Sequence, residues 1–287
     1  MPNPTNITVG VLALQGAFLE HLNLLRRAAT QLQSQSASTS QDELQFDLIQ
    51  VRNVAQLSKC DALIIPGGES TTMSLVAAQS GLLEPLREFV KVHRKPTWGT
   101  CAGLILLAEA ANATKKGGQE LIGGLDVRVN RNHFGRQVES FQADLDLPFL
   151  NEAANQTNGS SSSPAPYQGI FIRAPVVEKI LPNVDGIQKD EQQVAETVVA
   201  PSKSAKDDRA RLAMSSTVEI MGKLPGRVRK ASTGGEEVSA GDEVGDIIAV
   251  QQGNVFGTSF HPELTADARI HVWWLNRVVE LTDRTAV

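Results

Sequence analysis

The sequence predicts an α/β fold with a mostly parallel sheet and helices on both of its faces. In the first half of the chain, short apolar runs alternate with segments of helical periodicity, which is typical of parallel sheets connected by helices. In the second half, apolar runs follow one another with few helices between them, and this predicts an antiparallel extension of the sheet. The 287 residues, 41% of them apolar, suffice for one sizeable domain.

The first half supplies the predicted parallel strands and their helices. Residues 7–14 form a short apolar run before Gly16, as expected of a buried strand. Phe18, Leu22 and Leu25 then recur at helical spacing and predict an amphipathic helix over residues 17–32. Further strands are expected at residues 46–51, 62–65 and 96–99, and further helices at 72–79, 82–93 and 104–111.

The second half supplies the predicted extension, a final strand and a closing helix. We expect extension strands at residues 125–129, 138–145, 167–173, 196–199 and 247–251, a last strand at 255–260 and a helix at 266–281. Polar tracts at about 33–42, 151–166 and 202–245 are rich in Ser, Gln, Gly or charge. We interpret these tracts as surface insertions in a single domain that spans residues 1–287.

Composition excludes several classes of protein. The net charge of −5, without a basic run interleaved with aromatics, argues against nucleic-acid binding. No apolar run approaches the length of about 20 residues that a membrane span needs, and the start of the chain lacks the basic and apolar regions of a signal peptide. Two cysteines cannot form a disulfide scaffold, so a reduced, cytoplasmic location is expected.

The segment Gly99-Thr100-Cys101-Ala102-Gly103 is a nucleophile elbow with cysteine as the nucleophile. Glycines on both sides allow a sharp strand-to-helix turn, and the start of the following helix favours a thiolate. A small buried cysteine in a turn is the simpler alternative. Cys60 has no such glycines around it, so we interpret it as structural.

His261-Pro262-Glu263 directly follows the last predicted strand. An imidazole at the end of one parallel strand can reach a cysteine at the end of its neighbour. Glu263 could orient the ring and stabilise the imidazolium, as the third member of a triad does. A surface histidine beside a turn proline would explain this motif alone, but the order Cys…His-x-Glu makes a catalytic triad the better explanation.

Three further motifs are suited to binding an amino acid. The glycines of Pro66–Thr72 could direct a backbone N–H into a cleft to hold an oxyanion, and Ser70 and Thr71 suit the start of a helix. Arg131 and Arg173 could each hold an α-carboxylate. The alternatives are a plain glycine-rich turn and two solvated surface charges.

Together these motifs resemble the glutaminase subunit of pyridoxal 5′-phosphate synthase, a family within the class I glutamine amidotransferases. The resemblance covers nearly the whole chain, and its insertions favour a fungal-type member. One departure is His133, where the family commonly has a small polar residue. The matching segments are residues 10–17 with Glu20 and His21, 66–72, 99–104, 131–137, 171–175 and 259–265.

The resemblance implies a three-layer, flavodoxin-like fold and hydrolysis of glutamine without a metal or an organic cofactor. It also implies that ammonia passes to a (β/α)₈-barrel synthase subunit in vitamin B6 biosynthesis. The implied triad is Cys101, His261 and Glu263, and the implied oxyanion donors are the backbone N–H groups near Gly68 and Ala102. The implied glutamine-binding residues are Gly68, Glu69, Ser70, Arg131, Ile172 and Arg173.

Other functions remain open at this point. A glutaminase that serves another synthase, such as imidazole glycerol phosphate synthase, would share the triad but not the motifs at 131–137 and 171–175. A cysteine peptidase or redox protein of similar fold need not keep a glutamine clamp. A non-catalytic binding module need not keep Cys101, His261 and Glu263.

Overall fold

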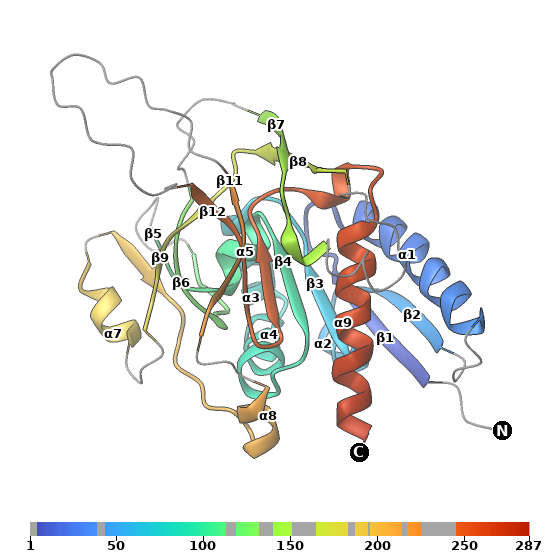
Figure 1. Cartoon of the computed structure of the whole chain (residues 1–287). Coiled ribbons are helices and arrows are strands. Elements are labelled where there is room, and N and C mark those ends of the chain that lie inside the picture. Colours follow the sequence, from blue (N-terminus) through green and yellow to red (C-terminus); the bar gives the residue numbers. More distant parts are fainter. Residues whose placement is uncertain are drawn as a thin grey trace, which may run out of the picture.

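A mixed β-sheet with helices on both faces forms the centre of the molecule (Figure 1). The computed structural model describes residues 5–38, 44–112, 119–131, 140–150, 165–182, 187–194, 196–213, 217–224 and 245–286. Five parallel strands run in the order β2-β1-β3-β4-β13, which is the flavodoxin-like order. They are β1 (Thr5–Leu12), β2 (Leu44–Val51), β3 (Ala62–Ile65), β4 (Thr97–Thr100) and β13 (Val255–Thr258).

The predicted antiparallel extension is confirmed beyond β13. Strand β12 pairs antiparallel with β13 and with β9, and β9 pairs antiparallel with β6. Strands β5 and β6 pair in parallel, and β10 closes that edge antiparallel to β5. The bounds are β5 (Ala108–Asn112), β6 (Leu125–Asn130), β9 (Val176–Ile180), β10 (Thr197–Val199) and β12 (Asp246–Gln252).

Two apolar layers attach the helices to the parallel strands. Because side chains alternate along a strand, Ile64 packs in the layer beneath α1 and α9, whereas Leu63 and Ile65 pack in the opposite layer. The first layer holds α1 (Phe18–Ser38) and α9 (Arg269–Ala286). The second holds α2 (Val54–Leu57), α3 (Ser70–Gln79), α4 (Leu83–Arg87), a π-helical turn η1 (Glu88–Val92) and α5 (Ala102–Leu107). No helix in the described ranges is long and apolar enough to cross a membrane.

Three elements differ from the expectation. Residues 104–111 are not one helix, because α5 ends at Leu107 and β5 begins at Ala108. A short run that is apolar except for Glu109 fits either structure, and pairing with β6 decides between them. Helix α1 continues to Ser38, since Gln and Ala in the polar tract tolerate a helix. Strands β7 (Ser140–Leu145) and β8 (Tyr167–Ile172) form their own two-stranded sheet instead of extending the main one.

The polar segment 202–245 contains more structure than its composition suggests. Helix α8 (Asp208–Leu212) and strand β11 (Glu219–Leu224) lie within this segment. Helix α7 (Ile187–Gln192) precedes it in the chain. Strand β11 pairs antiparallel with β12, and Leu224 is buried. Charged residues on the solvent-exposed side of this edge strand obscure the apolar pattern by which a strand is recognised in the sequence. Residues 151–164 and 225–244, in two of the predicted insertions, lie outside the described residues.

We expect that deleting residues 226–243 and joining the flanks by a short Gly/Ser linker preserves folding. Leu224 and Asp246 are paired across β11 and β12, so a short turn can connect them. A deletion of 203–243, which composition alone would allow, also removes β11 and is expected to reduce soluble protein. The yield and melting temperature of both variants provide the check, and equal behaviour of the two would contradict the role given to β11.

Candidate active site

The candidate site lies at the carboxyl ends of β4 and β13, which are neighbours in the parallel sheet. Cys101 follows β4 directly, and His261 follows β13 after two residues. Ligands of open α/β sheets bind at this edge. The structure therefore brings together the two side chains that the sequence predicted to meet.

Cys101 occupies a strained turn between β4 and α5. Its φ of 48° and ψ of −100° are rare for a residue with a side chain and typical of functional sites. Its N–H donates to the Thr258 carbonyl of β13 at 2.8 Å, which ties the turn to the neighbouring strand. A Cβ on Gly103 would lie 2.0 Å from the Ile65 carbonyl oxygen, so only glycine lets the helix pack so closely. The Cys101 side chain stays nearly buried, at 6% exposure.

His261 is held between a carboxylate and a glycine turn. Its Nδ1 lies 2.7 Å from Oε1 of Glu263, and its backbone N–H donates to the Ile170 carbonyl at 2.8 Å. A Cβ on Gly67 would lie 2.3 Å from Cε1 of the ring. The glycine at position 67 is thus required by the position of the imidazole.

The surroundings of His261 favour its charged form. Burial lowers the pKa of His261, but a hydrogen bond to Cys101, the hydrogen bond to Glu263 and the charges of both outweigh burial and raise that pKa to about 10. An imidazole with such a pKa is protonated at neutral pH. A positive charge beside Cys101 is what a nucleophilic cysteine requires.

Cys60 has the opposite environment. It is fully buried, its thiol donates to the Gln56 carbonyl at 3.3 Å, and burial raises its pKa to about 12. A thiol with this pKa is not a nucleophile at neutral pH.

Of the two predicted oxyanion donors, Ala102 directly follows Cys101, whereas Gly68 comes from a different turn. Ala102 is the first residue of α5, where a backbone N–H has no partner within the helix. Gly68 lies in the turn after β3, and Gln15 holds this turn, because its Oε1 accepts the Glu69 N–H at 2.9 Å. Gln15 was not among the predicted site residues, although it lies in the segment of residues 10–17 that matches the family.

Glu69 and Ser70 begin α3 and meet Arg131. The Glu69 carboxylate caps the helix by accepting the N–H groups of Thr71 and Thr72, so Glu69, rather than Ser70 or Thr71, is the cap. Nη2 of Arg131 donates to the hydroxyls of Ser70 and Thr71, each at 3.0 Å, and lies 3.9 Å from Oε1 of Glu69. Arg131 is therefore engaged in organising the start of α3.

Arg173 and Ile172 lie beside the nucleophile. The Ile172 carbonyl oxygen is 4.0 Å from Sγ of Cys101, which leaves Arg173 one residue from the reacting atom. Arg173 has a φ of 45° and is exposed. An exposed arginine whose neighbour in the chain contacts the nucleophile is well suited to a substrate carboxylate.

The two arginines should therefore differ when they are replaced. Arg173→Ala is expected to raise KM for glutamine at least about tenfold with a much smaller change in kcat, because it removes a contact made equally in ground and transition states. Arg131→Ala is expected to lower the melting temperature as well, since its guanidinium is buried against Ser70 and Thr71. Steady-state kinetics and thermal melts distinguish the two; an unchanged KM for Arg173→Ala would contradict its assignment.

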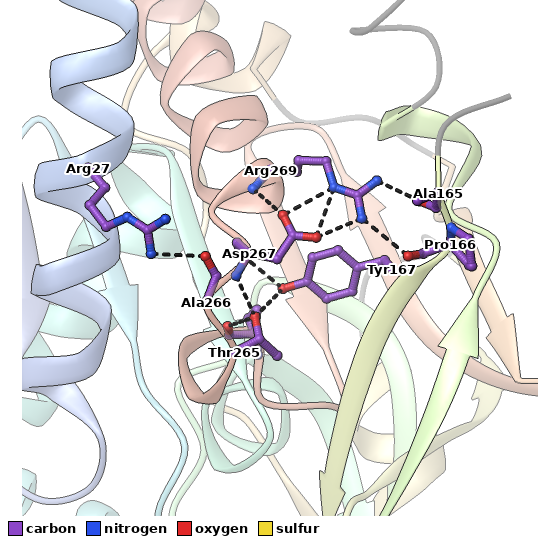
Figure 2. Close-up of polar contacts among 9 residues, drawn as sticks. Arg27, Ala165, Pro166, Tyr167, Thr265, Ala266, Asp267 and Arg269 are labelled. Carbon is purple, nitrogen blue, oxygen red and sulfur yellow. Dashed lines mark hydrogen bonds and ion pairs between the residues drawn. The ribbon is translucent and has the colours of Figure 1, made fainter. Parts of the chain in front are cut away.

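A polar network fixes the loop that follows Glu263 (Figure 2). The Tyr167 hydroxyl lies 3.4 Å from Oγ1 of Thr265 and donates to the Asp267 carbonyl at 3.5 Å. Arg269 pairs with Asp267 and donates to the carbonyls of residues 165 and 166. Arg27 of α1 donates to the Ala266 carbonyl at 2.9 Å, as Figure 2 also shows. The loop is thereby attached to both β8 and α1.

Family, sequence and structure comparisons all match this chain to glutamine amidotransferases over most of its length. The sequence matches the SNO glutamine amidotransferase family over residues 11–220 and 224–280. It is 42% identical to the probable pyridoxal 5′-phosphate synthase subunit PDX2 of Arabidopsis thaliana, over 96% of this chain and 87% of that protein. It is 34% identical to the PdxT subunit of Nocardioides sp., over 95% and 96% of the two chains. A crystal structure of a glutamine amidotransferase is 30% identical, with a TM-score of 0.59 over 94% of this chain and 98% of that one.

Proposed function

The chain belongs to the SNO glutamine amidotransferase family, and on this premise we propose that it hydrolyses L-glutamine to L-glutamate and ammonia with Cys101, His261 and Glu263. The observation that carries this proposal is the arrangement of these three side chains at the carboxyl ends of β4 and β13, with His261 bonded to Glu263 at 2.7 Å.

The reaction is an acyl transfer in two stages. The Cys101 thiolate attacks the carboxamide carbon, and the backbone N–H groups near Gly68 and Ala102 stabilise the oxyanion. The His261 imidazolium gives its proton to the amide nitrogen, which leaves as ammonia and a γ-glutamyl thioester remains. His261 then takes a proton from water, whose oxygen attacks the thioester. The intermediate collapses with cleavage of the C–S bond and expels the Cys101 thiolate, while His261 keeps the proton taken from water, so the starting pair is restored. The new γ-carboxyl group of glutamate releases its own proton to solvent.

The ammonia has an acceptor in a partner enzyme. The relatives are named as subunits of pyridoxal 5′-phosphate synthase, which favours this pathway over imidazole glycerol phosphate synthase. The partner is a (β/α)₈-barrel synthase subunit, as the sequence resemblance implies. The net charge of −5 supports the absence of nucleic-acid partners, and the short apolar runs support the absence of membrane partners. A cytoplasmic location is proposed because two cysteines cannot form a disulfide scaffold.

A thiol-reactive glutamine analogue, 6-diazo-5-oxo-norleucine, tests this function. Incubation in the presence of the barrel synthase should attach one label to Cys101, and excess glutamine should prevent the reaction. Peptide mass spectrometry locates the label. Labelling of Cys60, or labelling that glutamine does not slow, would argue against the proposed site.

A further inference from the structure

A buried histidine of α1 approaches the catalytic carboxylate from the side opposite His261. His21 is fully buried, with 0% exposure. Its Nε2 lies 3.3 Å from Oε2 of Glu263 and 3.2 Å from Oγ1 of Thr100, the residue before the nucleophile. Among the described residues Oε2 makes no hydrogen bond of good geometry, since Nε2 of His21 bonds to the Thr100 hydroxyl and only approaches Oε2. Glu263 therefore lies between two imidazoles, one at each oxygen.

A second buried histidine fixes the proton positions. Nδ1 of His21 lies 3.0 Å from Nε2 of His271 on α9. Burial lowers the pKa of both rings, that of His271 to about 3, so both are neutral and each has one donor and one acceptor. Nδ1 of His271 has no hydrogen-bond partner in the described part of the chain. An unpaired acceptor at this buried position costs less free energy than an unpaired N–H donor would. His271 thus donates from Nε2 to Nδ1 of His21, and the remaining proton of His21 is on Nε2.

We propose that His21 is a positioning residue for the reaction: the partial positive charge of its Nε2–H, 3.3 Å from Oε2, keeps the Glu263 carboxylate turned so that Oε1 faces Nδ1 of His261. This inference rests on the proposed function of Glu263. A carboxylate without this contact could rotate about its last bond and lose the 2.7 Å contact with His261. With Oε1 bonded to His261 and Oε2 attracted by His21, the carboxylate stays oriented while His261 gives up and regains its proton.

The packing around His21 supports a positioning role over that of an ordinary core histidine. The Trp98 ring makes T-shaped contacts with both imidazoles, at centroid distances of 5.6 Å to His21 and 4.9 Å to His271. This packing restricts rotation of the His21 ring away from Glu263. Helix α1 also bonds to the loop after Glu263 through Arg27 (Figure 2). The same helix thus fixes the segment 261–266 at the carboxylate and at the backbone.

Three replacements of His21 test the inference. Glutamine can place an amide N–H near the position of Nε2, asparagine can reach only the position of Nδ1, and leucine supplies neither. His21→Leu and His21→Asn are expected to lower kcat about 10- to 100-fold with KM within about twofold, whereas His21→Gln retains most of the activity. The rate of Cys101 alkylation by iodoacetamide should fall in the same order, because a misplaced carboxylate weakens the thiolate–imidazolium pair.

Thr97→Val is the matched control, since it removes a buried hydroxyl that donates to the Lys95 carbonyl at the other end of β4. It should lower the melting temperature without changing kcat. Equal kcat values for the Asn and Gln variants, or alkylation at the wild-type rate in both, would overturn the inference even if His21→Leu failed to fold. Failure of the wild-type protein with its synthase to release ammonia would instead count against the proposed function, while alkylation of Cys101 would still report on His21.

Discussion

Cys101→Ala is expected to abolish glutamine hydrolysis, lowering kcat by more than about 10³-fold, because the reaction loses its only nucleophile. The fold should remain intact. The side chain that is removed is small, and the backbone bonds that hold the turn, such as the Cys101 N–H to the Thr258 carbonyl, are kept. The positive φ of Cys101 is no harder for alanine than for cysteine, since both carry a Cβ. Glutamate release and the melting temperature are the measurements.

Cys60→Ala is the matched control for this prediction. Cys60 is fully buried in the core near Leu57 and Leu63, so alanine leaves a small cavity that costs about 1 kcal/mol. Its activity should stay near that of the wild type, because its thiol cannot ionise at neutral pH. Equal loss of activity in both variants, at unchanged stability, would mean that the assignment of the nucleophile is wrong.

The central strands, and the proximity of Cys101 and His261, could be predicted from the sequence because both follow from the burial of parallel strands. Parallel strands buried on both faces are nearly continuous apolar runs, and the predicted bounds of β3 coincide with the observed Ala62–Ile65. Residues that follow two such strands meet when the strands are neighbours. The apolar runs alone do not show that β4 and β13 are neighbours. The motifs at Cys101 and His261 supplied this information, because a triad requires the two strand ends to be adjacent.

Two strands outside the parallel part of the sheet could not be predicted in the same way. Strands β9 and β11 are short, and β11 is only partly covered, so their charged residues mask the alternation. Pairing with a neighbour forms these strands, and a sequence does not show pairing. For His21 a signal did exist, because it lies three residues after Phe18 and four before Leu25, on the apolar stripe of α1. A titratable side chain on a core-facing stripe requires a buried partner.

The isolated chain is expected to hydrolyse glutamine slowly, and addition of the barrel synthase is expected to raise the rate at least about tenfold. Free ammonia is mostly protonated at neutral pH and is then no nucleophile, so uncoupled hydrolysis would waste glutamine. The Gly67–Gly68 turn is a suitable moving part, because glycine allows a peptide to flip at little steric cost. The Gly67 carbonyl accepts the Ala17 N–H at 3.3 Å, so a partner bound at the start of α1 could release this peptide and turn the Gly68 N–H toward the oxyanion.

The outer face of α1 allows a direct test of this coupling. Arg27 of this helix donates to the Ala266 carbonyl, so its replacement would disturb the loop after Glu263 with or without the synthase. Leu19 is a better probe, because it is 51% exposed and an exposed apolar side chain is typical of a contact with a partner. Leu19→Asp should leave the basal rate unchanged and reduce the activation by the synthase, whereas Arg27→Ala should lower both rates. Glutamate release, measured for each variant across a titration of the synthase, separates the two effects. Full activity of the wild-type chain alone would exclude the coupling, because a turn that is already in its active conformation needs no partner to rearrange it.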